Sequence, residues 1–247
     1  MGQVIAVVSG KGGTGKSSFT AGVGSALALT GHKVLCLDCD VGLRNLDLSL
    51  GMADRALMDF SDVIAGRCSL SDAVVPHPRI RNLYLLTAPV RLRADEVDAS
   101  RMKGLVQTLK EEFDFCLMDA PAGLGLGFQL AVCGADRAVV VAGTDPSSLR
   151  DAQHTVSQLR AFPTGKLHLV VNRVRKKLLR TLHSTIDDAI DAAGLPLIGV
   201  IPEDDALILA LNHGVPLLLT DTNCAAQAYR NIANRLSGKK TPLMRLR

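Results

Sequence analysis

Short apolar runs rich in β-branched residues alternate along the chain with longer stretches of helical spacing. Helices are predicted at 19–29, 101–112, from 146 onward and at 222–236, with two short helices inside 59–75. Ser69 and one of Ser147 or Ser148 are the expected N-caps. Strands are predicted at 4–8, 33–37, 82–89, 113–119, 138–142, 166–173 and 196–201. This alternation predicts an α/β fold with helices on both sides of a twisted, mainly parallel sheet.

A glycine loop joins the first predicted strand to the first helix and matches the P-loop pattern Gly-x4-Gly-Lys-Ser. Backbone N–H groups of such a loop, together with the positive end of the following helix, attract phosphate. Lys16 is expected to reach the β- and γ-phosphates, and the Ser17 hydroxyl to bind Mg²⁺. The candidate nucleotide-binding residues of the loop are Gly10, Lys11, Gly12, Gly13, Thr14, Gly15, Lys16, Ser17 and Ser18. The sequence therefore predicts a three-layer α/β/α P-loop NTPase domain over residues 1–237.

Lys11 lies at the entrance of this loop, too far along the turn to repeat the role of Lys16 in its own site. Its side chain either reaches across an interface to the phosphates of a facing subunit or is a solvated loop lysine. The local chemistry leaves both possibilities open.

Carboxylates follow two predicted strands at the edge of the sheet where open α/β folds bind ligands. Asp38 and Asp119 are expected to hold Mg²⁺ through water, and Gly123 allows a backbone N–H to approach the γ-phosphate. Asp40 is expected to orient the attacking water. An aspartate with an ordinary pKa of about 3.9 is a poor base at neutral pH, so positioning is its expected contribution.

Three segments resemble motifs of the MinD/ParA class of P-loop ATPases, and most closely those of its MinD family. They are the loop Lys11–Ser17, which resembles the deviant Walker A motif, and the segments Asp38–Asp47 and Asp119–Gly123, which resemble switch I and switch II. The resemblance implies that Lys11 acts across an ATP-sandwich dimer and that Asp40 is required for hydrolysis.

The same resemblance assigns further residues. Arg44 and Asn45 are implied near the nucleotide and the dimer interface. Asp151 is a candidate partner of Lys11, although a solvated helix acid is an equal alternative. Asn172, whose amide offers a donor and an acceptor together, is implied at the adenine edge. Further base-side candidates are Arg173, Pro202, Glu203 and Asp204, of which Asp204 also suits a helix cap.

Composition adds limits to this picture. At 247 residues and 47% apolar content, the chain can bury one large core. It lacks an apolar run near the ~18 residues that a membrane span needs, and the run at 4–8 is too short for a signal peptide. These features predict a cytoplasmic protein. Cys36 and Cys39 are expected on opposite faces of a strand, roughly 10 Å apart, which excludes a shared metal or a disulfide.

Basic residues are concentrated near the C-terminus. Residues 231–247 carry five cations and no acid, so the remainder of a chain with net charge +4 has a charge of −1. The tail 238–247 combines basic and apolar residues and is a candidate membrane anchor, although it is short for a stable helix. A second basic run, Arg173 to Arg180, is either a solvated face or a nonspecific DNA contact.

The resemblance implies an ATP- and Mg²⁺-dependent dimerising switch that positions the division septum. Its implied partners are a MinC-type division inhibitor, a MinE-type activator and the anionic inner face of the cell membrane, with no specific nucleic acid. A ParA-like or flagellar-number regulator that acts on DNA or a polar complex is the main alternative. A metabolic ligase would need a substrate pocket with extra cationic groups, which the sequence does not indicate.

Overall fold

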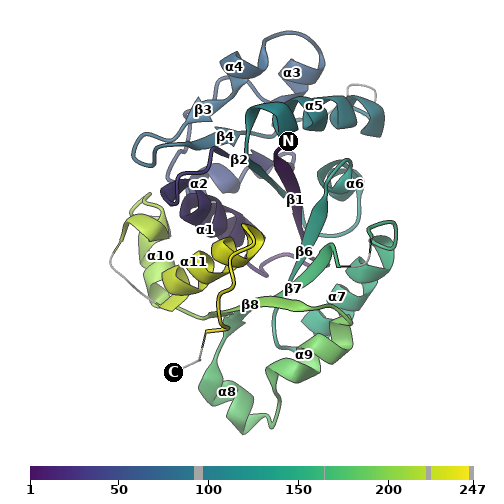
Figure 1. Ribbon diagram of the computed structural model, residues 1–247, viewed down its shortest axis with the longest axis vertical. Coiled ribbons are helices and arrows are strands. Elements are labelled where there is room, and N and C mark those ends of the chain that lie inside the picture. Colours follow the sequence, from purple (N-terminus) through teal and green to yellow (C-terminus); the bar gives the residue numbers. More distant parts are fainter. Residues whose placement is uncertain (92–96, 164, 221–223, 245–247) are drawn as a thin grey trace.

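The computed structural model describes residues 1–91, 97–163, 165–220 and 224–244. Within these residues a single twisted sheet crosses the molecule in the order β3-β4-β2-β5-β1-β6-β7-β8 (Figure 1). Neighbouring strands are parallel, except that β3 runs antiparallel to β4. The strands are β1 Gln3–Val8, β2 Val34–Asp38, β3 Val75–Pro76, β4 Leu83–Leu86, β5 Phe115–Asp119, β6 Arg137–Ala142, β7 Leu167–Val174 and β8 Leu197–Pro202.

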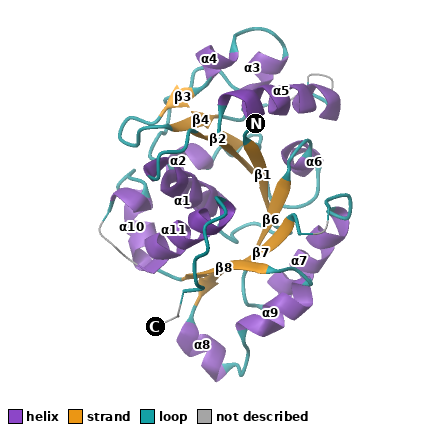
Figure 2. Cartoon of the chain, in the orientation of Figure 1, coloured by secondary structure: helices purple, strands orange, loops and turns teal. Residues whose placement is uncertain are grey.

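Helices cover both faces of this sheet, which gives three layers (Figure 2). One apolar cluster lies between the sheet and the helices α1 Lys16–Leu29, α2 Leu46–Ser49, α10 Asp205–Asn212 and α11 Cys224–Leu236, with the short 3₁₀ turn η1 Leu217–Leu219. The other cluster lies beneath α3 Phe60–Ile64, α4 Leu70–Ala73, α5 Ala99–Glu112, α6 Leu126–Val132, α7 Pro146–Gln158, α8 Lys176–Thr181 and α9 Ile186–Ala193. The predicted three-layer α/β/α fold with a mainly parallel sheet is confirmed.

Alternation along the central strands explains why both faces are apolar. In β1, Val4, Ala6 and Val8 belong to one cluster, whereas Ile5 and Val7 belong to the other. A strand covered on both sides needs apolar residues at every position, and the sequence therefore shows a continuous apolar run. Cys36 and Cys39 likewise enter opposite clusters as free thiols, as predicted, although β2 itself ends at Asp38.

Two predicted helix starts have different outcomes. Ser69 caps α4 as expected, because its hydroxyl accepts a hydrogen bond from the backbone N–H of Asp72. The cap of α7 is Asp145 instead of Ser147 or Ser148. Pro146 occupies the first turn, where proline is favoured, so the residue before it becomes the cap. The expected start of the last helix at Thr222 lies outside the described residues, and α11 is described from Cys224.

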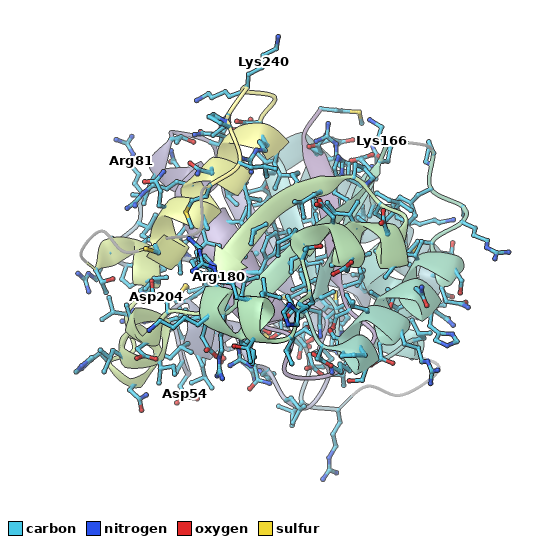
Figure 3. The ribbon with its side chains drawn as sticks, turned by 90° about the horizontal axis from the view of Figure 1, so that it is seen from below. Asp54, Arg81, Lys166, Arg180, Asp204 and Lys240 are labelled. Atoms are coloured by element: carbon cyan, nitrogen blue, oxygen red, sulfur yellow. The ribbon has the colours of Figure 1, made fainter. Side chains whose placement is uncertain are left out.

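The C-terminal segment folds back on the body after α11. The Arg235 guanidinium donates to the carbonyl oxygens of Ile198 at 2.6 Å, of Thr241 at 2.9 Å and of Pro242. Met244 packs against the core, whereas Lys240 projects away from the body (Figure 3). Residues 239–244 form neither helix nor strand, and the predicted tail residues 245–247 lie outside the described chain. No helix among the described residues has the length and apolar content needed to cross a membrane.

Candidate nucleotide-binding site

The glycine loop between β1 and α1 has a conformation that requires glycine at several positions. Gly13 and Gly15 have φ angles of 76° and 89°, in the left-handed region that other residues avoid. A Cβ at Gly15 would lie 2.3 Å from the amide nitrogen of Asn172, and one at Gly10 would lie 2.5 Å from the backbone oxygen of Asp151. At Gly13 a Cβ would meet nothing within 4 Å, so the loop faces open space there. The backbone thus forms an open hollow with no side chain to fill it.

The first turn of α1 has the properties of an anion site. Gly15 occupies the N-cap position without any side-chain cap, and the first turn contains no acidic residue. The first N–H groups of a helix have no partner inside the helix, and they carry the positive end of its dipole. In this helix they stay available to a phosphate.

Lys16 begins α1 and is buried. Its ammonium group donates to the Ser9 hydroxyl at 2.8 Å. Burial lowers the pKa of Lys16, and the carboxylates of Asp119 and Asp40 act in the opposite direction. A largely desolvated ammonium beside an open hollow is placed to bind an anionic oxygen.

Asp38 and Asp119 lie side by side at the ends of β2 and β5, where the parallel register pairs them. Both are buried. The Asp38 carboxylate accepts from the backbone N–H groups of Asp40 at 2.7 Å and Leu46 at 3.2 Å, and Asp119 accepts from the Thr20 hydroxyl at 3.1 Å. Burial raises the pKa of Asp38 to about 7, and the negative charge of the neighbouring Asp119 is the second cause of this rise. Burial also raises the pKa of Asp119, to about 6.

These two carboxylates fit a divalent cation. Two buried acids of one sign repel each other, and a cation of opposite charge relieves the repulsion. Ser17 lines the cavity beside the glycine loop and hydrogen-bonds to Asp119. Among the described residues there is no group of three or more His, Cys, Asp or Glu side chains that could hold a metal alone. The donor set therefore suits Mg²⁺ that arrives with phosphate oxygens and water.

The buried carboxylates make a prediction about pH. A carboxyl with a raised folded-state pKa contributes stability that is complete below the unfolded pKa near 4 and is lost as the pH rises through about 6 to 7. Asp119→Asn cannot ionise, so it removes the loss of stability that ionisation of Asp119 causes. Its amide oxygen can still accept the hydrogen bond from the Thr20 hydroxyl. We expect the nucleotide-free variant to gain about 1–2 kcal/mol in unfolding free energy at pH 8 and to gain little at pH 4.

Urea denaturation at both pH values measures this gain. Asp191→Asn is the matched control, because Asp191 is an exposed acid on α9. Equal gains from the two variants at pH 8 would contradict the expectation.

Lys11 turns away from this cavity. Its ammonium group pairs with the Asp145 carboxylate at 2.9 Å and donates to the Ser147 hydroxyl at 2.7 Å. Hydrogen bonds from Ser147, and to a smaller extent from Lys11, lower the pKa of Asp145 to about 2. The expected partner Asp151 is not the carboxylate that Lys11 contacts, because the Asp151 backbone packs against Gly10 instead. The side chain of Lys11 is 36% exposed, so it is accessible from outside the subunit.

Asn172 and Arg173, the residues implied at the adenine edge, line the cavity and hold the backbone of the glycine loop. The Asn172 amide donates to the Thr14 carbonyl at 2.8 Å and accepts from the Arg173 N–H at 2.9 Å. Arg173 has a φ of 57° and donates to the Gly13 carbonyl at 2.9 Å. Each amide atom of Asn172 retains capacity for a further hydrogen bond.

The segment after β8 differs from the expectation. Glu203 pairs with Arg175, and Asp204 caps α10 by accepting from the Ala206 N–H at 3.0 Å. Neither these two residues nor Pro202 line the cavity. The capping role of Asp204, which the sequence allowed, is thus confirmed, whereas this wall of the cavity comes from the following helix, α10.

The cavity has a volume of about 600 Å³ and extends from the loop to α10. Most of the phosphate-side candidates line it, together with Asn45, Asn172 and Arg173. Those that do not line it are Gly10, Lys11, Thr14, Asp38, Asp119 and Gly123. The lining residues that sequence reasoning missed are Leu43, Leu48, Ser49, Ala120, Ala122, Leu207, Ile208, Leu211 and Asn212. The apolar character of most of them could not show that they face a cavity, because helix residues that pack on a core have the same character.

A three-layer α/β fold, an uncapped helix after a glycine loop and a buried lysine beside two strand-end carboxylates together define a P-loop nucleotide-binding protein. The family model for the CobQ/CobB/MinD/ParA nucleotide binding domain matches residues 5–217. The septum site-determining protein MinD of Synechocystis is 39% identical over 99% of this chain and 92% of its own length.

Solved structures agree with this match. MinD in the MinC:MinD cell division complex of Aquifex aeolicus superposes with a TM-score of 0.90 at 37% identity and covers 98% of both chains. MinD of Pyrococcus horikoshii, solved with Mg-ADP, gives a TM-score of 0.81 at 31% identity and covers 96% of both chains. The chain therefore belongs to the MinD family within the CobQ/CobB/MinD/ParA nucleotide-binding class.

Proposed function

We propose that this protein is an ATP-dependent switch in septum positioning, which dimerises with ATP and Mg²⁺ and resets by hydrolysis. One observation carries the proposal: the uncapped start of α1 and the buried Lys16 line one cavity, and a pair of buried carboxylates lies next to it, where Asp119 hydrogen-bonds to the cavity-lining Ser17. That combination suits a triphosphate with its cation. The relatives that match over nearly the full chain are septum site-determining proteins.

The residues of the chain have separable roles in this proposal. The loop N–H groups and Lys16 bind the phosphates, and Ser17, Asp38 and Asp119 hold Mg²⁺, directly or through water. Bound Mg²⁺ would neutralise phosphate charge. Asp40 lines the cavity and positions the attacking water, and the backbone of Gly123, at a φ of 82°, adapts to the γ-phosphate.

Exposed apolar residues lie on or next to the two segments that resemble the switches. Leu43 is exposed on the segment Asp38–Asp47 and lines the cavity, and Leu124 and Leu126 are exposed directly after the segment Asp119–Gly123. A second copy of the chain would cover these residues, and Lys11, which lies outside its own cavity, would reach the phosphates of the facing copy. Arg44 and Asn45 lie with Leu43 on the segment Asp38–Asp47. The dimer would present a surface to a MinC-type inhibitor and a MinE-type activator.

The C-terminal segment is the proposed contact with the inner membrane surface. Lys239 and Lys240 are exposed beside Leu243, and basic residues bind an anionic leaflet at about 1 kcal/mol each. Two copies double this contact, which would make membrane attachment depend on dimerisation. The protein would then move between the cytoplasm and the inner face of the membrane.

Sedimentation of the Asp40→Ala protein with ATP tests the proposal. We expect a dimer with ATP and Mg²⁺, a monomer with ADP, and co-sedimentation with anionic liposomes only in ATP. Removal of residues 239–247 should abolish the liposome binding and leave the dimer intact. A particle that stays single with ATP would contradict the switch, and salt-sensitive retention on DNA would favour the ParA-like alternative.

A further inference from the structure

Helix α10 forms the outer wall of the nucleotide cavity but is lightly attached to the body. Ala210 is its one buried residue. Ile208 and Leu209 are 54% and 60% exposed. A second, small pocket separates Leu207 and Leu211 from Ala21 and Gly22 of α1. With so little packing beneath it, the position of α10 depends on how its two ends are held.

The N-terminal end is held by Asp204. One carboxylate oxygen caps α10 through the Ala206 N–H, and the other accepts from the N–H of Ala225 in α11 at 3.1 Å. This end is therefore tied to the core helix α11, beside which α10 lies in Figure 1.

The C-terminal end rests on a contact between two glycines. Gly214 follows α10, and its carbonyl lies against Gly51, which follows α2. A Cβ built on Gly51 would lie 2.2 Å from the Gly214 oxygen and 3.3 Å from the Cδ of Pro216. Both glycines are in the left-handed region, at φ 65° and 60°. A side chain at Gly51 would push the end of α10 away from α2, because the atoms it meets first are backbone.

The α2 side of this contact is rigid. Nδ1 of His77 accepts from the backbone N–H groups of Arg79 and Ile80, so its Nε2 carries the proton and donates to the Leu50 carbonyl at 2.9 Å. At the other end of α2, the Leu46 N–H donates to Asp38. Gly51 is thereby tied to the carboxylate end of the site, and it is the α10 side that would move.

We propose that the contact of Gly51 with Gly214 sets the spacing between α2 and α10, and that the cavity between these helices binds the nucleoside part of the nucleotide. Leu48 on one side and Leu207, Ile208 and Leu211 on the other supply apolar surface that suits the faces of an aromatic base. Gly51 is a positioning residue, since it does not line the cavity itself. The inference rests on the proposed nucleotide-binding function.

Calorimetric titration of ATP and of inorganic tripolyphosphate, each with Mg²⁺, tests this spacing in two variants. Gly51→Ala is expected to weaken ATP binding by about tenfold and to change tripolyphosphate binding by less than about twofold. Gly214→Ala is the matched control, because it has the same left-handed backbone but its Cβ would meet nothing within 4 Å. Both ligands should bind this control within about twofold of the unchanged protein. Amide exchange in nucleotide-free protein should show faster exchange in α10 for Gly51→Ala than for Gly214→Ala.

A second pair of variants carries less risk to folding. Ile208 lines the cavity and is half-exposed, so Ile208→Ala should weaken the binding of ATP but not that of tripolyphosphate. Leu209 lies beside it but does not line the cavity, so Leu209→Ala should change the binding of neither ligand. The inference is overturned if Gly51→Ala and Gly214→Ala behave alike, if both ligands weaken equally, or if Ile208→Ala leaves the preference for ATP unchanged. Failure of the unchanged protein to bind ATP would instead refute the proposed function.

Discussion

Replacing Lys11 by alanine is expected to abolish ATP-dependent dimerisation and to lower turnover by about 100-fold or more, while the single chain keeps ATP affinity within about threefold. The reason is the position of the side chain. Lys11 contacts Asp145 and Ser147 outside the cavity, whereas Lys16 occupies the phosphate side within the same subunit. If turnover needs Lys11 although its own site keeps its affinity without it, the Lys11 ammonium acts on the phosphates of a facing copy. Sedimentation velocity and phosphate release measure the two effects.

Two further variants separate this role from a loss of surface charge. Lys103→Ala removes an exposed lysine on α5 and should change neither dimerisation nor turnover. Asp145→Asn weakens the pair that holds Lys11 within its own subunit and keeps an oxygen to cap α7. We expect it to dimerise at an ATP concentration no higher than the unchanged protein needs. If Lys11→Ala dimerises normally with ATP, Lys11 has no role across an interface.

The phosphate side of the site could be predicted from the sequence because its geometry is local or set by the sheet. The loop requires glycines at fixed spacing between one strand and one helix, so a single continuous segment specifies the hollow. Asp38 and Asp119 are distant in sequence, but both end buried parallel strands. Once the strands are predicted, the register of β2 and β5 brings the two carboxylates together.

The wall of the cavity that α10 forms could not be predicted in the same way. Leu207, Ile208 and Leu211 have ordinary helical spacing, and only the packing of α10 decides that they face a cavity instead of the core. The contact of Gly51 with Gly214 joins two loops far apart in sequence, and neither loop carries a motif. These features depend on the position in which α10 packs against the rest of the protein. The local pattern of apolar and polar residues does not determine that position.

The carboxylate that pairs with Lys11 is Asp145 and not Asp151, and Pro146 marks its position in the sequence. Asp145 and Asp151 both belong to the start of α7, and the resemblance favoured Asp151. Pro146 marks the first turn of that helix, which makes Asp145 the cap and turns its carboxylate toward the glycine loop. Placing the cap at the residue before Pro146, two residues before Ser147, would have identified Asp145 as the cap.

Replacing Asp40 by alanine is expected to lower ATP turnover by about 100- to 1,000-fold and to leave ATP-dependent dimerisation intact. Asp40 lines the cavity, and its contact with Asp38 is made by its backbone, whose N–H donates to the Asp38 carboxylate at 2.7 Å. Truncation of the Asp40 side chain leaves this backbone contact in place. The substitution therefore removes a carboxylate from the cavity and keeps the backbone contact to Asp38, the proposed Mg²⁺ ligand. Phosphate release at saturating ATP, with sedimentation in parallel, tests both halves.

The pH dependence of turnover distinguishes an ionised Asp40 from a neutral one. Burial raises the pKa of Asp40, and the nearby Lys16 ammonium limits the rise. A water-orienting carboxylate acts in its ionised form, so turnover should increase with pH through this raised pKa and then level off. Asp40→Asn keeps the size and one oxygen but cannot ionise, and it should have low turnover with this pH step absent. Retention of the step in Asp40→Asn would assign the titration to Asp38 or Asp119, because these are the other carboxylates of the site with a raised pKa.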